Sequence, residues 1–233
     1  MPRTGDAIHI EVRRQVSALS LQADRPLILC DADEVLLRFV EALEAYLEEC
    51  GLALELTSFA LTGNIKDRRN GESVPAAEVR RLLADFYEHR TGTIGPVAGA
   101  AEALSALARQ AQIVVVTNVP LHRAEARRQN LRQHGMDYPV VANIGSKGGA
   151  VGLLAQAVEA PVFFLDDIPR NLASVAAEAA EVVRLHFVAD PRLARLVAAA
   201  EHCHARLDTW PEARAYIEAH LAGANPGREA ACE

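Results

Sequence analysis

The chain has 233 residues, half of them hydrophobic, and a formal net charge of -7. This length suits one globular domain, or one domain with an insertion. The negative charge disfavours a nucleic-acid polymer as the partner, because proteins that bind phosphate backbones usually present a basic face. The sequence shows no signal-peptide pattern and no apolar run of the roughly 20 residues that a membrane helix needs, so we expect a soluble, cytoplasmic protein without a membrane partner.

Apolar segments of strand type alternate with segments of helical spacing along most of the chain. A helix that packs outside the main sheet is expected within residues 1–24. The predicted strands cover residues 27–30, 113–116, 140–144, 162–165 and 182–188, and the predicted helices cover residues 97–110, 121–134, 148–159, 170–180 and 191–205. Continuous apolar strands that alternate with helices predict an α/β fold, in which a parallel sheet is covered on both faces.

The spacing between the first two predicted strands indicates an insertion. Residues 31–112 separate them, which is far more than one crossover helix requires. Within this stretch, residues 35–50 and 76–90 have the pattern of amphipathic helices, and the polar residues 62–73 connect them. We therefore expect a small helical cap over residues 36–95.

The expected domain organisation follows from this insertion. Residues 1–35 and 96–222 would form a discontinuous α/β core, and residues 223–233 would form a frayed tail. The oligomeric state is left open by the sequence.

Polar residues that could carry chemistry follow three of the predicted strands and begin one of the helices. They are Asp31 and Asp33, Thr117 and Asn118, Asp166 and Asp167, and Lys147. In an open parallel sheet, ligands bind beyond the carboxyl ends of the strands. The sequence thus predicts four carboxylates, a hydroxyl, an amide and an ammonium group at one rim of the sheet.

This arrangement resembles the four motifs of the haloacid dehalogenase superfamily of phosphatases. The motif D-x-D-x-[TV] is matched by DADEV at residues 31–35, the Thr that ends a strand by Thr117, the Lys near a helix start by Lys147, and the acidic pair by Asp166 and Asp167. The four matches occur in the family's order and span nearly the whole chain. The resemblance implies a Rossmann-like parallel sheet with strand order 3-2-1-4-5 and a cap inserted after the first motif.

The resemblance also implies a role for each of these side chains. Asp31 would attack phosphorus and become an aspartyl-phosphate, while Asp33 would protonate the leaving oxygen and later deprotonate water. Asp31, the backbone carbonyl of Asp33, and Asp167 would hold Mg²⁺, and Asp166 would bond to a metal-bound water or to Lys147. Thr117 and Asn118 would donate hydrogen bonds to the phosphate, and Lys147 would offset the negative charges.

The expected substrate is a small soluble phosphomonoester, and four further residues are candidates for contacting it. Position 34 is often Gly in relatives with this type of cap, whereas here it is Glu34, which is expected to narrow the entrance, contact the cap or bind a basic substrate group. Lys66, Arg68 and Arg69 in the polar connection could reach an anionic or polar substrate. A solvated basic loop is an equally good interpretation of these three residues.

Three functions remain open at this point. A phosphatase would pass the phosphoryl group from Asp31 to water, whereas a phosphomutase or phosphotransferase would pass it to another hydroxyl group. A phosphate-binding module without useful turnover would keep the fold, but it would have no need for a general acid at Asp33. The acid at Asp33 also favours phosphoryl chemistry over dehalogenation, because the dehalogenase branch lacks an acid at this position.

Overall fold

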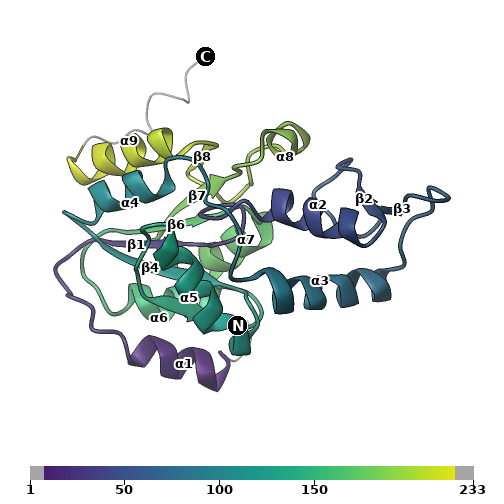
Figure 1. Ribbon diagram of the computed structural model, residues 1–233. Helices are drawn as coiled ribbons and strands as arrows, with labels where there is room; N and C mark the ends of the chain where they lie inside the picture. Colours follow the sequence, from purple (N-terminus) through teal and green to yellow (C-terminus); the bar gives the residue numbers. More distant parts are fainter. Residues whose placement is uncertain (1–7, 224–233) are drawn as a thin grey trace, which may run out of the picture.

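A six-stranded parallel sheet forms the centre of the protein in the computed structural model, which describes residues 8–223 (Figure 1). Its strands are β1 (Leu27–Cys30), β4 (Gln112–Thr117), β5 (Val140–Ala142), β6 (Val162–Asp166), β7 (Val183–Phe187) and β8 (Ala205–Leu207). They lie in the order β5-β4-β1-β6-β7-β8, and every neighbouring pair is parallel. The predicted α/β fold and the predicted order of five strands are confirmed, and β8 adds an edge strand that was not predicted.

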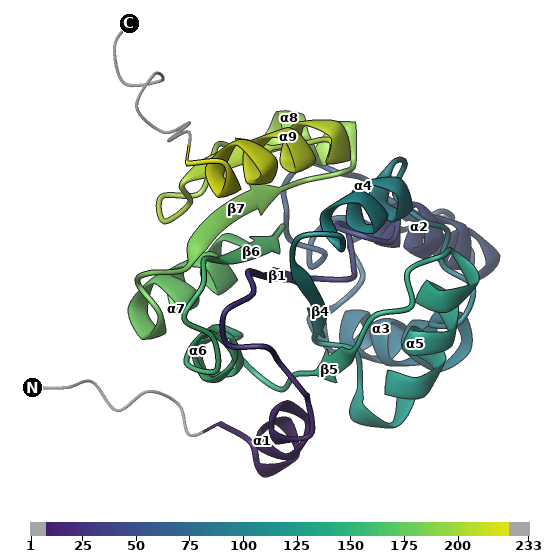
Figure 2. The same cartoon turned by 90° about the vertical axis from the view of Figure 1, so that its left-hand side faces the viewer.

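Helices cover both faces of this sheet (Figure 2). They are α1 (Ile10–Ser17), α4 (Ala100–Leu107), α5 (Ala124–Gln133), α6 (Gly148–Ala155), α7 (Pro169–Glu178), α8 (Pro191–Leu196) and α9 (Trp210–Leu221), with a 3₁₀ turn, η1 (Leu121–Arg123), before α5. Within residues 8–223, no helix has both the length and the apolar character required to cross a bilayer.

The alternation of side chains along the strands divides the core into two layers. Ile28 and Cys30 of β1 belong to a cluster that includes Trp210 of α9, with side chains from α4 and α5. Leu27 and Leu29 point to the opposite face and pack with residues of α1, α6 and α7. Because both faces of β1 are buried, its sequence is continuously apolar, and the first polar residue after it lies at the rim of the sheet.

The insertion between β1 and β4 projects from one end of the sheet (Figure 1). It contains α2 (Phe39–Glu49), α3 (Ala76–Arg90) and a two-stranded antiparallel hairpin of β2 (Leu52–Leu54) and β3 (Ile65–Asp67). Both helices were predicted, whereas the hairpin was not. We refer to residues 39–90 as the cap. Phe39 and Tyr46 of α2 contact the ring of Phe86 on α3 edge to face, which fixes the two cap helices against each other.

Three of the predicted helices differ from those observed. The helix predicted for residues 191–205 ends at Leu196. Ala205, the end of the predicted range, is the first residue of β8. The helix predicted for residues 35–50 begins at Phe39, because Glu34 N–H donates to the Leu37 carbonyl and closes a turn there. Within residues 1–24, α1 is a short helix at Ile10–Ser17 that contacts α6 and β5. Residues 1–7, and the predicted tail from residue 224, lie outside the described residues.

Trp210 links α9 to the loop after β1. Its side chain is fully buried, and its indole Nε1–H donates a hydrogen bond to the carbonyl oxygen of Val35 at 2.8 Å. The ring also contacts Phe187 of β7, with ring centroids 5.3 Å apart. A buried carbonyl needs a donor, so Trp210 supports the backbone that carries the first motif.

We expect Trp210→Ala to lower the free energy of unfolding by about 3–5 kcal/mol, because it removes a large buried side chain. Trp210→Phe keeps much of the packing and removes the donor to Val35, so we expect a smaller loss of about 1–3 kcal/mol. Urea unfolding followed by circular dichroism measures both values. Equal stability of the Phe variant and the parent protein would show that the hydrogen bond contributes nothing.

Candidate active site

Lys147 connects acidic residues from two neighbouring strands at the rim of the sheet. Its ammonium nitrogen lies 2.7 Å from Oδ1 of Asp31, directly after β1, and 2.7 Å from Oδ2 of Asp166, at the end of β6. Strands β1 and β6 are neighbours in register, so Cys30 is paired with Leu165. Asp31, Asp166 and Asp167 therefore offer ligand oxygens that all lie within 4.8 Å of one another.

The position of Lys147 depends on the close approach of helices α6 and α7. Lys147 is 1% exposed and directly precedes Gly148, the first residue of α6. A Cβ atom on Gly148 would lie 2.4 Å from the carbonyl oxygen of Ser174 on α7, and the Gly148 N–H instead donates to Ser174 Oγ at 3.0 Å. Glycine at this position thus allows α6 to bring Lys147 close to the acids.

The carboxylates in this group outnumber the ammonium. Burial raises the pKa of Asp31 to about 7, Lys147 opposes this, and the charges of Asp166 and Asp33 add to it. Burial also raises the pKa of Asp167 well above its usual range, and the charges of Asp166 and Asp31 act in the same direction. Burial alone would lower the pKa of Lys147, but Asp166 and Asp31 outweigh burial and raise it. One lysine offsets only part of the negative charge of these acids.

The two residues of the acidic pair, Asp166 and Asp167, differ in the hydrogen bonds that they accept. Oδ1 of Asp166 accepts from the Ile168 N–H and from Asn171 Nδ2, and Oδ2 accepts from Lys147. The Asp167 carboxylate accepts no hydrogen bond from any residue of the described range, although its side chain is buried. Asp31 and Asp167 therefore have oxygen lone pairs free for a cation. An all-carboxylate donor set with excess negative charge fits a hard divalent ion such as Mg²⁺.

Asp33 lies on the same loop but has different partners. Its Oδ1 accepts from Arg127 NH2 of α5 at 2.7 Å, and its Oδ2 accepts from the hydroxyl of Tyr87 on the cap helix α3 at 3.0 Å. Arg127 is fully buried, and its Nε and NH1 atoms have no partner within the described residues. The core thus holds one oxygen of Asp33 and the cap holds the other.

Sequence reasoning did not find Arg127 or Tyr87. Both belong to helices with unremarkable spacing, and they lie 94 and 54 residues from Asp33 along the chain. No motif signals them, because long-range folding alone brings them to Asp33. The complete burial of an arginine side chain can be recognised only once the structure is known.

Thr117 and Asn118 follow β4, the other neighbour of β1. The Thr117 hydroxyl is buried and has no hydrogen-bond partner in the described part of the chain. Asn118 Nδ2 donates to the Gly145 carbonyl at 2.9 Å, and its Oδ1 accepts from Asn143 at 2.9 Å. An unpaired buried hydroxyl is costly unless a ligand or water uses it, so Thr117 has a free donor for an anion.

Glu34 adopts a backbone conformation that is unusual for its residue type. Its φ angle is 58°, in the left-handed region that favours glycine. Its Oε1 accepts a hydrogen bond from the Val40 N–H at 2.6 Å, at the beginning of α2. Burial raises the pKa of this acid to about 7. The acidic side chain that replaces the frequent glycine therefore fixes the start of the first cap helix.

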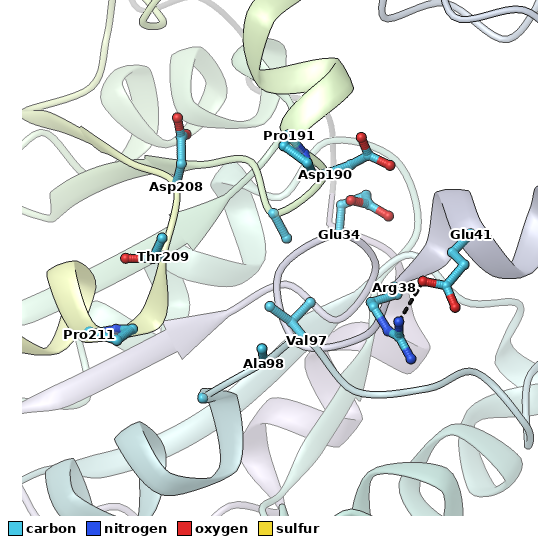
Figure 3. Close-up of a pocket in the computed structure, with 12 residues that line it drawn as sticks. Glu34, Arg38, Glu41, Val97, Ala98, Asp190, Pro191, Asp208, Thr209 and Pro211 are labelled. Carbon is cyan, nitrogen blue, oxygen red and sulfur yellow. Dashed lines mark hydrogen bonds and ion pairs between the residues drawn. The ribbon is translucent and has the colours of Figure 1, made fainter.

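Two cavities meet at Glu34. The first, of about 330 Å³, contains Asp31, Asp33 and Asp167 and is enclosed by residues of the cap. The second, of about 490 Å³, lies on the other side of Glu34 and is shown in Figure 3. The remaining acidic side chains around this second cavity are already paired with arginines: Glu41 with Arg38, Asp190 with Arg192 and Asp208 with Arg206. We therefore assign the active site to the smaller cavity, where the free carboxylates converge.

The structure does not bring the three basic residues of the predicted polar connection to this cavity. Lys66 Nζ donates to Ser73 Oγ at 2.6 Å, Arg68 pairs with Glu48 of α2 at 2.6 Å, and Arg69 pairs with Asp67 at 2.7 Å. The residues that line the cavity from the loop between β2 and β3 are Leu56, Ser58, Phe59, Ala60 and Leu61. The cap approaches the acids with these mainly apolar residues.

Comparison with known proteins identifies the fold. No protein-family model matches the chain, and no curated protein sequence matches it. Among solved structures, a haloacid dehalogenase-like hydrolase from Streptococcus pneumoniae is 9% identical, with a TM-score of 0.56 over 84% of this chain and 100% of that one. A haloacid dehalogenase family hydrolase from Deinococcus radiodurans, with bound phosphate and sodium, is 18% identical, with a TM-score of 0.50 over 87% and 97% of the two chains.

A third structure agrees with these two. A haloacid dehalogenase-type hydrolase from Bacillus subtilis, bound to magnesium, is 13% identical, with a TM-score of 0.53 over 87% of this chain and 99% of that one. The chain therefore has the haloacid dehalogenase fold, which confirms the fold implied by its four motifs.

The raised pKa of Asp167 predicts a pH-dependent effect of Asp167→Asn on stability. Above about pH 4, the unfolded chain releases this proton while the folded protein retains it, so the buried acid lowers stability as the pH rises. In EDTA, we expect the stability of Asp167→Asn relative to the parent protein to increase as the pH rises above about 4.

Thermal and urea unfolding at a series of pH values measure this difference. Asp24→Asn, which makes the same substitution at an exposed position, is the matched control. A difference that does not change with pH for Asp167→Asn would contradict the assignment of a buried, disfavoured charge at this position.

Proposed function

We propose that this protein is a Mg²⁺-dependent phosphatase of the haloacid dehalogenase superfamily, and that it hydrolyses a small phosphomonoester through an aspartyl-phosphate on Asp31. The observation that best supports the proposal is the convergence of Asp31, Asp167 and Lys147 beside a second, separately held acid, Asp33. The phosphate bound to the Deinococcus radiodurans structure and the magnesium bound to the Bacillus subtilis structure support the same classes of ligand.

The first chemical step would begin at the free oxygen of Asp31. Oδ1 accepts from the Ala32 N–H at 2.6 Å and from Lys147, whereas Oδ2 accepts no hydrogen bond within residues 8–223. Oδ2 would form a bond to phosphorus as the bond between phosphorus and the ester oxygen breaks. Asp33 would transfer its proton to the departing oxygen, which leaves as the alcohol.

The second step would return the enzyme to its starting state. A water molecule would attack the phosphorus of the aspartyl-phosphate and give its proton to Asp33, and the bond to Asp31 would break to release phosphate. Thr117 and Lys147 would bind the phosphate oxygens throughout. Mg²⁺, held by Asp31, the main-chain carbonyl of Asp33, and Asp167, would supply the positive charge that the acids lack.

Arg127 and Tyr87 would act on the reaction as positioning residues for Asp33. The Asp33 carboxylate accepts one hydrogen bond from each of these residues, which holds it in the form of a base. To serve as the acid, it must lose one of these two hydrogen bonds. Tyr87 belongs to the cap, so movement of the cap would change the contacts of Asp33. This arrangement would couple the position of the cap to the proton transfer.

Phosphate release from p-nitrophenyl phosphate, with Mg²⁺ or with EDTA, tests the proposed function. We expect Mg²⁺-dependent hydrolysis by the parent protein and a loss of about 10³-fold or more in Asp31→Asn, because the amide cannot act as the nucleophile. Asp24→Asn, at an exposed position away from the site, should retain full activity.

The products distinguish the proposed function from its alternatives. Undiminished activity of Asp31→Asn would refute the assignment of Asp31 as the nucleophile. Transfer to an added alcohol without release of phosphate would establish a phosphotransferase or phosphomutase instead. Tight binding of phosphate esters without any turnover would establish a phosphate-binding module.

The contact between Tyr87 and Asp33 makes a prediction that depends on the leaving group. We expect Tyr87→Phe to lower kcat/KM about tenfold for an alkyl phosphate and much less for p-nitrophenyl phosphate, since nitrophenolate leaves without help from an acid. The phenylalanine ring would keep the packing against Phe39 and Phe86.

Tyr46→Phe is the matched control for this variant. The Tyr46 hydroxyl also bonds to an acid within the cap, Asp85 at 2.6 Å, but neither residue lines the catalytic cavity. We expect no change in kcat/KM for either substrate. An equal loss for both substrates in Tyr87→Phe would show a general effect on the cap and not a role in positioning Asp33.

A further inference from the structure

The catalytic cavity has two chemically different ends. The acids and Lys147 form one end, and the cap and α8 form the other. The side chains at the second end are predominantly apolar: Phe39, Leu56, Phe59, Leu61, Leu83 and Leu193. An ester bound with its phosphate beside Asp31 would place its alcohol portion against these side chains.

The loop that supplies half of these apolar side chains is closed by its own hydrogen bonds. It comprises residues 55–64, between β2 and β3. Asn64, which is 3% exposed, donates to the Ser58 carbonyl at 2.8 Å and accepts from the Thr57 hydroxyl at 2.7 Å. The Asn64 carbonyl accepts from the Glu55 N–H at 2.8 Å, which closes the loop at its base. Leu56, Phe59 and Leu61 are thus presented to the cavity by a loop that is already ordered.

The loop also packs against the core on the far side of the cavity. Leu56 and Phe59 contact a buried cluster formed by Val40 of α2, Val188 after β7 and Leu193 of α8. This contact joins the cap to the core, and Val40, Leu56, Phe59 and Leu193 of this contact also line the cavity.

Most polar side chains of the cavity wall are already engaged by the protein. The Tyr87 hydroxyl is bonded to Asp33, both ends of the Asn118 amide are bonded, and Asn171 donates to Asp166. Among the described residues that line the cavity, Ser58 and the exposed Arg170 retain free donors, and Oε2 of Glu34 and Oδ1 of Asn171 accept no hydrogen bond. None of these four groups belongs to the apolar side chains of the cap and α8, so hydroxyl groups of a sugar that lie against those side chains would lose water without finding a partner.

We propose that the substrate is a phosphomonoester of a small apolar alcohol, aryl-substituted or alkyl, and not of a sugar or other polyol; this inference rests on the proposed phosphatase function. Each buried methylene group of the alcohol favours binding by about fourfold, whereas each unpaired hydroxyl group opposes it. A cavity of about 330 Å³ is near the lower end of the range for small-molecule sites, which restricts the alcohol to a few carbons or one ring.

Two esters with the same skeleton test the proposal. Cyclohexylmethyl phosphate and glucose-6-phosphate both join phosphate to a CH₂ group on a six-membered ring, so that their leaving groups are similar and the ring hydroxyl groups are the main difference. With Mg²⁺ and the full chain, we expect kcat/KM to be at least about tenfold higher for the cyclohexyl ester.

Variants of the loop test whether the preference depends on the apolar character of the wall or only on the presence of a side chain there. Phe59→Asn should reduce this preference several-fold, because it introduces a polar group into the wall, and Phe59→Leu should keep it. Glu55→Gln, at an exposed position of the same loop that does not line the cavity, should leave the preference for the cyclohexyl ester in place. An unchanged preference in Phe59→Asn would contradict a role of the apolar wall in selecting the substrate.

The two possible failures can be distinguished. Equal or faster hydrolysis of glucose-6-phosphate would overturn the inference about the substrate and leave the phosphatase intact. Absence of phosphate release from every ester, p-nitrophenyl phosphate included, would overturn the proposed function and this inference with it.

Discussion

The bridge from Lys147 to Asp31 and Asp166 is the interaction on which the site depends. The two carboxylates come from adjacent strands, β1 and β6, and without a cation between them their repulsion in a buried environment would force protonation or separation. The cost of burying Lys147 is offset because it contacts two partners at once. The position of Lys147 depends on helix packing. Gly148 allows α6 to approach α7 closely, and this contact places the lysine at the rim. A helix-packing residue thus controls the electrostatics of the acids.

The cap is tied to the core through the acids themselves and not through a flexible linker alone. Glu34 bonds to the first turn of α2, and Asp33 bonds to Tyr87 of α3, so that both cap helices contact consecutive residues of one loop. The loop also carries the candidate nucleophile, three residues before Glu34. Opening of the cap would therefore disturb Asp33 and Glu34 directly. One short loop thus carries both the candidate catalytic acids and the contacts that hold the cap. The left-handed conformation of Glu34 is part of this connection.

The sequence predicted the centre of the protein better than its periphery. Strands β1, β4 and β6 are buried on both faces, so their apolar runs and the polar residues at their carboxyl ends were visible without coordinates. β8 and the cap hairpin have three-residue strands in polar or mixed segments, too short to show an alternating pattern. The helix predicted to run to residue 205 was extended through residues whose spacing is compatible with a helix but whose backbone forms an edge strand. Arg127 has the appearance of a surface residue on an amphipathic helix, and only the packing of α5 reveals its burial.

The hydrogen bond from Trp210 to Val35 joins α9 to the first motif over a long stretch of the chain. During synthesis, the loop after β1 leaves the ribosome long before α9 exists, so the Val35 carbonyl remains without this donor until α9 has been made. The nascent chain can pair β1 with β4 and β6 earlier, but the loop that carries Asp31 gains its support from Trp210 only afterwards. A chain that terminated before α9 would therefore present its acids on a loop that lacks this support.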